Sequence, residues 1–289
     1  MRPRKKDRQG PAGEDNLTAS YRCWNRLTRL ACGSRGILYA AWRRVRGKLS
    51  PVRYGMAAKS QDFLYDGPPP RGLKEMGPIE QYFWSSEDLH ADKWLSFLPV
   101  YDRYFAPFED KPVRVLEIGV QGGDSLRMWR EFFGRDAVIF GVDIDPRCAS
   151  LDGDFGQVRI GSQADASFLQ AVVEEMGGVD IVIDDGSHQM EHIKASFIAL
   201  FPLLADGGIY LVEDLGCSYW ANFGGGRGRP GTFLELVKCL IDDVHHNYHD
   251  GHVNVPAAKD RLLGIHIYDQ IVVLEKGSLP SPKRAIRRP

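Results

Sequence analysis

Short β-rich runs alternate with helical stretches through the middle of this 289-residue sequence. Such alternation predicts a mainly parallel sheet with helices on both faces. Two last runs flank the tight turn Asp269-Gln270 and add antiparallel strands at one edge. The predicted fold is therefore α/β. Its predicted strands are 113–118, 138–142, 179–183, 209–212, 262–268 and 271–274.

The predicted helices lie between these strands. The first has Leu126, Trp129 and Phe133 on one face, behind Asp124 or Ser125 as N-cap. An apolar stripe runs from Met190 to Leu204, and the glycine-containing stretch 205–208 ends it. The other two predicted helices span about 164–176 and 233–244.

The predicted core strands end in acidic residues or glycine. In open α/β sheets, ligands bind outside the carboxyl ends of the strands. We therefore expect the residues at these ends to line one cleft. They are Glu117 to Gly119, Asp143, Asp184-Asp185 and Glu213-Asp214.

A glycine-rich turn, Glu117-Ile-Gly-Val-Gln-Gly-Gly123, joins the first strand to the first helix. It is neither a dinucleotide fingerprint nor a phosphate-binding loop with Gly-Lys-Ser/Thr. Asp143 stands at the end of the next strand, where a carboxylate can accept hydrogen bonds from both hydroxyls of a ribose. Gly161 to Asp165 follows a third short run and is placed to contact an adenine edge. Together these segments predict a site for a nucleoside-containing cofactor.

A second cluster combines four acidic residues with a histidine. Adjacent parallel strands end about 5 Å apart, so Asp184-Asp185 and Glu213-Asp214 can meet. A hard divalent cation such as Mg²⁺ would relieve their repulsion, although helix capping and surface salt bridges would also account for single acids. His188 is a candidate general base. His192, four residues later, is a candidate supporting residue, and the run between them lacks the zinc-protease pattern.

Charge divides the chain. Residues 1–60 hold fifteen Lys and Arg against three Asp and Glu, a net charge of +12, and the remainder carries −13. The sequence thus predicts a basic, partly helical or disordered arm at 1–60, a linker at 61–79, an organised domain at 80–277 and a basic tail at 278–289. The arm suits an anionic membrane surface or loose packing, and Met56 offers an alternative start.

Recognised modules, apolar runs and cysteines in the sequence bear on its partners and its cellular compartment. No nucleic-acid partner is predicted, since no recognised module accompanies the basic charge. No apolar run reaches the roughly 20 residues of a membrane span. The five cysteines are odd in number and lack a CxxC pair, which argues against a disulfide framework and favours a reducing compartment. The predicted location is the cytoplasm, with membrane association through the arm as an open option.

The glycine-rich turn and Asp143 together resemble the first motifs of class I S-adenosylmethionine-dependent methyltransferases. The resemblance implies S-adenosylmethionine as cofactor and a sheet in the order 3-2-1-4-5-7-6 with strand 7 antiparallel. It implies that the turn packs on the methionine part and that Asp143 binds the ribose. The implied cofactor-binding residues are Glu117, Gly119, Gln121, Gly122, Gly123, Asp143, Ser162, Gln163, Asp165 and Asp184.

The stretch from Asp184 to Trp220 resembles one subgroup, the metal-dependent macrolide sugar O-methyltransferases of the mycinamicin VI 2''-O-methyltransferase type. The resemblance extends over about 80–277 and includes Asp92-Lys93. It implies Mg²⁺-assisted methylation of a sugar hydroxyl on a glycoside, natural product or glycan, with a small-molecule or lipid-linked acceptor and a homo-oligomeric state. By position, His188 is the catalytic base, and the metal ligands are Asp185, Glu213 and Asp214.

Three alternatives stay open at this point. A metal-dependent methyltransferase of catechol-like small molecules would use the same cleft and ion. Cephalosporin hydroxylase-like proteins share much of the expected architecture. A non-catalytic, membrane-associated relative would keep the fold without the chemistry, although the complete set of acids and His188 argues against it.

Overall fold

The computed structural model describes residues 65, 67–279 and 281–287. The basic arm predicted at 1–60, the alternative start at Met56 and the first residues of the predicted linker lie outside these residues. All of the described residues belong to one compact unit, Val52–Pro289.

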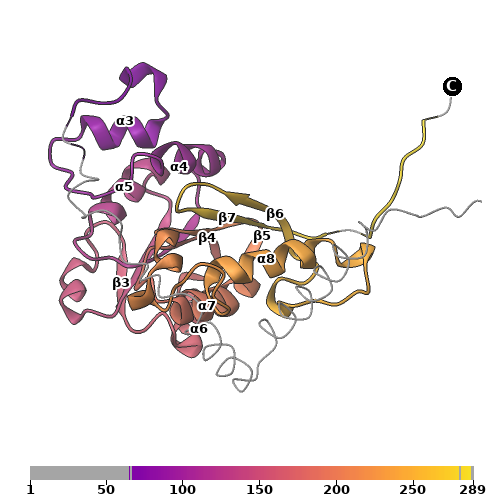
Figure 1. Cartoon of the computed structure of the whole chain (residues 1–289). Coiled ribbons are helices and arrows are strands. Elements are labelled where there is room, and N and C mark those ends of the chain that lie inside the picture. Colours follow the sequence, from indigo (N-terminus) through magenta and orange to yellow (C-terminus); the bar gives the residue numbers. More distant parts are fainter. Residues whose placement is uncertain (1–64, 66, 280, 288–289) are drawn as a thin grey trace, which may run out of the picture. The chain divides into compact units, whose positions relative to one another are not determined.

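A seven-stranded sheet with the order β3-β2-β1-β4-β5-β7-β6 forms the centre of this unit (Figure 1). Strands β1 to β5 pair in parallel, and β7 pairs antiparallel with both β5 and β6. The predicted α/β fold and the order implied by the family resemblance are both confirmed. The strands are β1 (Arg114–Ile118), β2 (Val138–Asp143), β3 (Gln157–Ile160), β4 (Val179–Asp184), β5 (Leu204–Val212), β6 (Leu262–Ile267) and β7 (Val272–Lys276).

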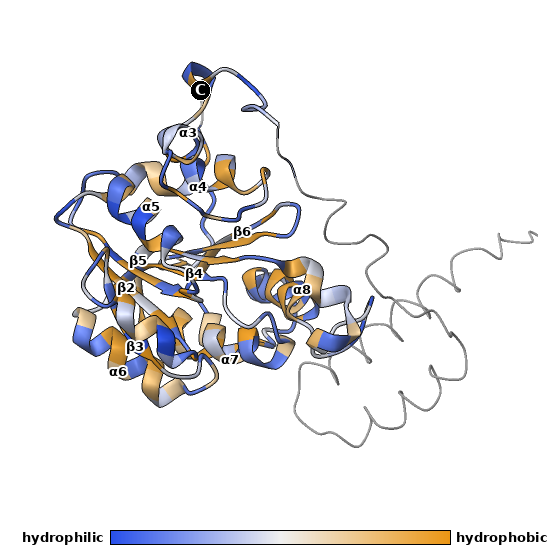
Figure 2. Cartoon of the chain, turned by 90° about the vertical axis from the view of Figure 1, so that its left-hand side faces the viewer, coloured by the Kyte–Doolittle hydropathy of each residue, from blue (hydrophilic) through white to orange (hydrophobic). Residues whose placement is uncertain are grey.

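Helices cover both faces of the sheet. One layer contains α3 (Pro78–Ser85), α4 (Leu98–Phe105) and α5 (Asp124–Phe133), and the other contains α6 (Ala166–Met176), α7 (Met190–Leu200) and α8 (Phe233–Val244) (Figures 1 and 2). Figure 2 shows apolar residues on the helix faces toward the sheet and polar ones outside, as amphipathic helices require. Short 3₁₀ turns connect them at Leu73–Glu75, Ala106–Phe108, Pro146–Leu151, Phe201–Leu203, Leu215–Tyr219, Ala221–Phe223, His246–Tyr248 and Pro256–Ala258.

Two predicted boundaries were wrong. The N-cap of α5 is Gly123 in a left-handed conformation (φ 85°), not Asp124 or Ser125. Strand β5 begins at Leu204, which the sequence pattern assigned to the preceding helix. Leu204 instead pairs with Val179, so the chain re-enters the sheet through the stretch predicted as a break. The cause is tertiary pairing, which overrides a local apolar period.

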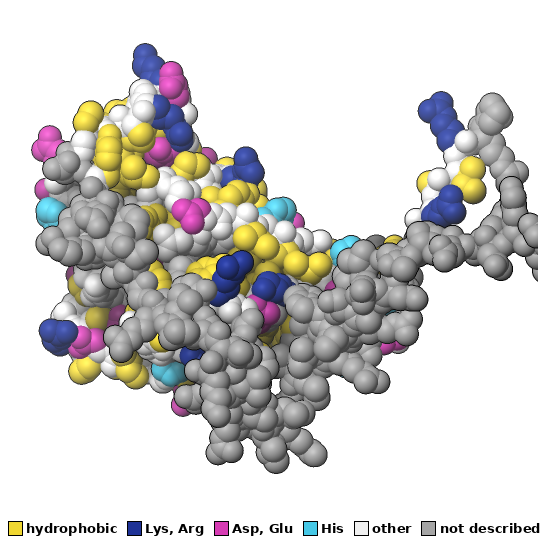
Figure 3. Space-filling model, in the orientation of Figure 1, with side chains coloured by type: hydrophobic (Ala, Val, Ile, Leu, Met, Phe, Trp, Pro, Cys, Tyr) yellow, Lys and Arg dark blue, Asp and Glu magenta, His cyan; other side chains and the backbone are white. Residues whose placement is uncertain are grey.

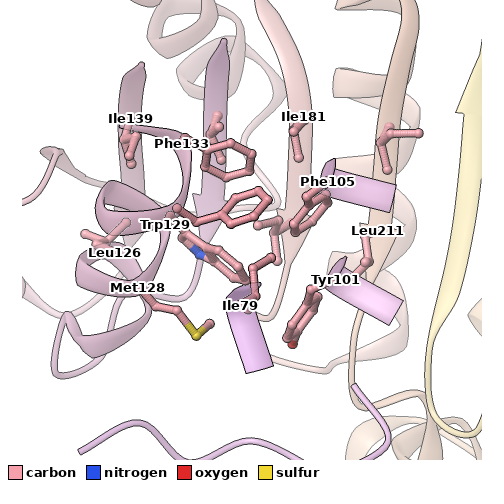
Figure 4. Close-up of a cluster of buried hydrophobic side chains, with 14 of the residues drawn as sticks. Ile79, Tyr101, Phe105, Leu126, Met128, Trp129, Phe133, Ile139, Ile181 and Leu211 are labelled. Carbon is pink, nitrogen blue, oxygen red and sulfur yellow. The ribbon is translucent and has the colours of Figure 1, made fainter. Parts of the chain in front are cut away.

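The core between the first helix layer and the sheet is rich in aromatic rings (Figure 4). Trp129 on α5 is fully buried and meets Tyr101 and Phe105 of α4 edge-on, with ring centroids 5.1 and 5.5 Å apart. Such pairs contribute about 0.5–1.5 kcal/mol each beyond their burial. This packing fixes α4 and α5 over β1 and so holds the loops that follow β1.

The surface of the described unit is mixed in character. On the face drawn in Figure 3, charged groups of both signs lie scattered among hydrophobic and other side chains. No helix among the described residues combines the length and apolar character needed to cross a bilayer. Cys148 and Cys217 are buried free thiols.

Candidate active site

A cavity of about 1910 Å³ opens at the carboxyl ends of β1, β2, β4 and β5. Its lining brings together residues at or just after the ends of these four strands, which are Gly119, Asp143, Asp185, Glu213 and Asp214. This is the position in which parallel α/β sheets bind their ligands. The cavity is large enough for more than one small molecule.

The glycine-rich turn forms one wall of this cavity. Gly119 has φ +97°, and a Cβ atom on it would lie 2.1 Å from the backbone oxygen of Asp185. Only glycine therefore fits between the ends of β1 and β4. Gly122 is exposed and lines the cavity, as does Gln121, so backbone at this turn is open to a ligand.

Asp143 fixes the conformation of that turn. Its Oδ2 accepts hydrogen bonds from the N–H groups of Val120 (2.9 Å) and Gln121 (3.0 Å), and its Oδ1 accepts from Asp145 N–H (2.8 Å). The carboxylate is half-buried and lines the cavity. Each carboxylate oxygen has two lone pairs, so Asp143 can hold the turn and still accept from a ligand hydroxyl.

Four of the residues implied for cofactor binding do not line the cavity: Glu117, Gly123, Asp165 and Asp184. Glu117 lies under the turn, where it accepts hydrogen bonds from Ser125 Oγ (2.9 Å) and Trp129 Nε1 (3.0 Å). Burial raises the pKa of Glu117 to about 7. Gly123 and Asp165 cap α5 and α6. These residues support the turn and the helices from beneath.

Asp184 belongs to a buried network that positions the loop after β4. Its carboxylate accepts from Gln163 Nε2 (3.0 Å), Tyr210 OH (3.2 Å) and Ser196 Oγ. Burial raises the pKa of Asp184 to about 6. Gln163 Oε1 in turn accepts from Ser187 N–H (2.7 Å), which connects the network to the loop that carries His188. Ser162 and Gln163 both line the cavity.

Asp185, His188 and Asp214 form a compact group at the cavity wall. One donor atom from each lies within 4.8 Å of the others, a spacing that suits a single bound metal ion. His188 Nε2 is 3.6 Å from Asp214 Oδ2, and Trp94 Nε1 donates to Asp214 Oδ1 (2.9 Å). His188 (φ 55°) and Asp214 (φ 53°) both have left-handed backbones, a conformation that costs about 1–3 kcal/mol and concentrates at functional sites.

Glu213 lies beside this group but is bound by other side chains. Lys93 Nζ donates to Glu213 Oε2 (2.8 Å) and to Asp185 Oδ2 (2.6 Å), and Tyr101 OH donates to Glu213 Oε1 (2.7 Å). Burial and the nearby Asp185 charge raise the pKa of Glu213 to about 8. Burial alone would lower the pKa of Lys93, but Glu213, Tyr101 and Asp185 together raise it well above its usual value.

Lys93 is the residue that sequence reasoning missed. It stood only within a stretch of family resemblance, and no spacing rule places residue 93 beside residues 185 and 213. Its side chain is 4 % exposed, so its charge is matched by the two carboxylates rather than by water. The one sequence signal for Lys93 was the family resemblance at Asp92-Lys93. The next residue, Trp94, also contacts the site, through Asp214.

His188 and His192 do not lie on one helix face, although on a helix their four-residue spacing would place them there. Helix α7 begins at Met190, so His188 lies in the preceding loop and His192 in the first turn. His192 Nδ1 pairs with Ser187 Oγ at 2.8 Å, and both histidines line the cavity.

Known proteins resemble this arrangement. Residues 116–215 match the family model of a methyltransferase domain. A tetracenomycin 3'-O-methyltransferase from Streptomyces olivaceus is 43 % identical over 198 residues, which cover 64 % of this chain and 50 % of that protein. The mycinamicin VI 2''-O-methyltransferase of Micromonospora griseorubida is 42 % identical over 63 % of this chain and 48 % of its own length.

Solved structures agree with these relatives. The MycE methyltransferase of mycinamycin biosynthesis, in complex with Mg and SAH, superposes with a TM-score of 0.59 at 38 % identity. The match covers 63 % of this chain and 49 % of that one. A complex of the same enzyme that also contains mycinamycin VI gives 0.58 at 39 % identity, over 65 % and 51 % of the two chains. This chain thus spans about half the length of the relatives it matches.

The match begins within β1, ends after β5 and contains both clusters of the cavity wall, the glycine-rich turn with Asp143 and the Asp185–Asp214 group. The sheet order agrees with that implied by the resemblance. The chain therefore has the methyltransferase-type sheet, matches a methyltransferase domain over residues 116–215, and is similar in sequence and structure to O-methyltransferases that act on tetracenomycin and mycinamicin compounds.

Proposed function

We propose that the chain is an S-adenosylmethionine-dependent, Mg²⁺-assisted O-methyltransferase that acts on a sugar hydroxyl of a glycoside, natural product or glycan. One observation carries the proposal. The glycine-rich turn with Asp143 and the group of Asp185, His188 and Asp214 line the same cavity. A nucleoside site and a cation site therefore face one space, which is what methyl transfer to a chelated hydroxyl needs.

The cavity wall fits S-adenosylmethionine. The turn exposes Gln121 and Gly122 to the cavity, and the absence of a side chain on Gly122 leaves its backbone open to a ligand. Asp143 would accept from the ribose hydroxyls, and Ser162 and Gln163 would border the adenine. Glu117, Gly123, Asp165 and Asp184 keep their place in the proposal as supports of that site, because they hold its turn, helices and loop from outside the cavity.

The donor set also fits a hard divalent ion. Carboxylate oxygens of Asp185 and Asp214 would hold Mg²⁺, with Glu213 beside them and oriented by Lys93 and Tyr101. Bound S-adenosylmethionine would supply the methyl group, and the ion would make a sugar hydroxyl easier to deprotonate.

His188 would take up the hydroxyl proton. Its Nε2 lies 3.6 Å from Asp214 Oδ2, so the protonated ring would face a carboxylate. Phe223 meets the ring edge-on with centroids 6.2 Å apart and limits its rotation. Lys93 Nζ donates to both Asp185 and Glu213 and so holds these two side chains beside each other. In this proposal His188 takes the proton, and the other residues hold it and the two carboxyl groups in position.

The acceptor and assembly are proposed from the relatives. Their names specify a rhamnosyl-tetracenomycin, mycinamicin VI and an olivosyl-oleandolide as substrates. We propose the same broad class for this chain, with a lipid-linked glycoside and contact of the arm 1–60 with a membrane as extensions. A homo-oligomer is proposed on the same basis.

A methylation assay tests the function. The purified chain would be incubated with S-adenosylmethionine, Mg²⁺ and a panel of glycosides and catechols, and methyl transfer would be followed by mass spectrometry. We expect methylated glycosides and no methylated catechol, and no product with EDTA. Methylation of the catechols alone would replace this proposal with the catechol alternative. Product formation unaffected by EDTA would remove the metal from it.

A further inference from the structure

The indole of Trp94 contacts one of the acidic residues proposed to hold the metal ion. Its Nε1 donates a hydrogen bond to Asp214 Oδ1 (2.9 Å) across 120 residues of sequence. In the described part of the chain, the carboxyl group of Asp214 accepts no other hydrogen bond. Rotation about the last bond of an aspartate side chain is only weakly restricted by local sterics. The hydrogen bond from Trp94 therefore restricts a carboxyl group that would otherwise turn.

The second oxygen of Asp214 lies at the proposed metal group. Oδ2 is 3.6 Å from His188 Nε2, and donor atoms of Asp185, His188 and Asp214 lie within 4.8 Å of one another. The side chain of Asp214 is 32 % exposed, so an ion in the cavity can reach it. One oxygen thus binds the indole, while the other lies beside His188.

Trp94 is itself held in place by its neighbours in the chain. The buried Lys93 donates to both Asp185 and Glu213, so the segment cannot move away without breaking these contacts. Phe97 N–H donates to Trp94 O (2.9 Å), and Phe97 is fully buried in the core. The side chain of Trp94 is partly buried and packs against the same core. The donor to Asp214 is therefore fixed by the fold.

We propose that Trp94 is a positioning residue for the metal ion, because its N–H holds the Asp214 carboxyl group in one orientation before the ion binds. Carboxylates that bind metal ions are commonly hydrogen-bonded by outer residues, and loss of such a residue lowers metal affinity by about 10–100-fold. An indole N–H is only a donor, so Trp94 acts through Asp214 and is not itself a ligand. The inference rests on the proposed function, which assigns Asp214 to the ion.

Binding of Mn²⁺ to the full chain tests this proposal. Mn²⁺ takes the same kind of oxygen ligands as Mg²⁺, and electron paramagnetic resonance measures its free concentration. Trp94→Phe keeps an aromatic ring and removes the N–H. We expect its affinity for Mn²⁺ to fall by about 10–100-fold. Calorimetry should show an affinity for S-adenosylhomocysteine within about threefold of that of the wild type.

Trp84→Phe is the matched control. Trp84 lines the same cavity, and its buried Nε1 donates to none of the described residues. The control therefore makes the same change of side chain without removing a hydrogen bond, and it should bind Mn²⁺ as the wild type does. Trp94→Leu removes the same N–H with a different side chain, and its loss of Mn²⁺ affinity should match that of Trp94→Phe.

Three results would overturn the inference. They are an unchanged Mn²⁺ affinity in Trp94→Phe, an equal loss in Trp84→Phe, and a loss of S-adenosylhomocysteine affinity that accompanies the loss of Mn²⁺ affinity. The last would make Trp94 a residue that supports the fold as a whole. Absence of Mn²⁺ binding by the wild type would contradict the metal in the proposed function as well. Wild-type binding that Trp94→Phe leaves unchanged would contradict only the role of Trp94.

Discussion

The two halves of the cavity wall are built by different kinds of contact. At the ends of β1 and β2, Asp143 accepts from backbone N–H groups of a turn 22 and 23 residues away, and the turn needs glycine for room. At the ends of β4 and β5, side chains meet side chains, and Lys93 reaches Asp185 across 92 residues of sequence. The first half is a backbone cradle, whereas the second is a charged cluster held by distant residues.

This difference separates binding from chemistry. A backbone cradle changes little when one side chain changes, so the cofactor half should tolerate substitutions in the charged half. The charged half depends on each of its groups, because a buried charge without its counter-charge is costly. The predictions below test whether the two halves respond independently.

The largest expected effect is on turnover, through His188→Ala. Removal of a general base lowers the rate by about 10²–10⁴-fold, and the backbone cradle should leave the affinity for S-adenosylmethionine unchanged. Single-turnover methylation and calorimetry would measure the two quantities. His252→Ala, which changes an exposed histidine outside the cavity, should behave as wild type. Retained turnover would exclude His188 as the base. If the variant instead lost its affinity for the divalent ion, His188 would be a metal ligand.

Lys93→Met should produce the largest loss of stability. It leaves Asp185 and Glu213 facing each other without the ammonium that lies 2.6 and 2.8 Å from them. Breaking a buried pair costs about 3–5 kcal/mol. Chemical denaturation would measure the change. Lys238→Met removes a half-exposed surface pair and should cost at most about 1 kcal/mol. Equal losses in the two variants would show that Lys93 is not part of a buried cluster.

Glu117→Gln should flatten the pH dependence of stability. The pKa of Glu117 rises from 4.5 to about 7 on folding because of burial. The folded state therefore binds more protons than the unfolded state between these values, and stability falls as the pH rises from about 4.5 to 7. Over that pH range, the free energy of unfolding of the variant should fall by roughly 2–3 kcal/mol less than that of the wild type. An unchanged slope in urea denaturation across these pH values would exclude Glu117 as its source.

Gly119→Ala should have the smallest of these effects, a loss of about 1–3 kcal/mol in the free energy of unfolding. The added Cβ would lie 2.1 Å from the backbone oxygen of Asp185. Affinity for S-adenosylmethionine should fall with it. Gly153→Ala is the matched control, since Gly153 has a similar φ of +93° but nothing within 4 Å of the added Cβ. The backbone strain is common to both variants, so a difference in thermal unfolding isolates the close contact. No difference would contradict the close approach of the β1 and β4 ends.

The comparison of the two halves also explains what could be predicted from sequence. The cradle is local, since a glycine-rich turn after one strand and an acid after the next are visible in a single βαβ unit. The strand ends that carry Asp185 and Asp214 could be predicted because parallel strands align their carboxyl ends. Lys93 and Tyr101 could not, because their approach to Glu213 depends on how α4 packs over the sheet.

The directions of side chains at the strand ends follow the same rule. Glu117 and Asp184 were assigned to the cofactor by position in a motif, but each side chain points into the interior, to Trp129 and to Gln163. Whether a strand residue faces the core or the cavity depends on the twist and register of the sheet, which motif spacing does not contain. The start of β5 at Leu204 was likewise set by pairing with Val179 rather than by its own neighbours.

The measurement that most directly tests the account is a calorimetric titration of S-adenosylmethionine into the purified chain, first with Mg²⁺ and then with EDTA. The account predicts saturable binding at one site, with an affinity that EDTA changes by less than about threefold, because the backbone cradle binds without the charged half. Absence of binding in both buffers would contradict the methyltransferase function. Binding that requires Mg²⁺ would contradict the separation of the two halves.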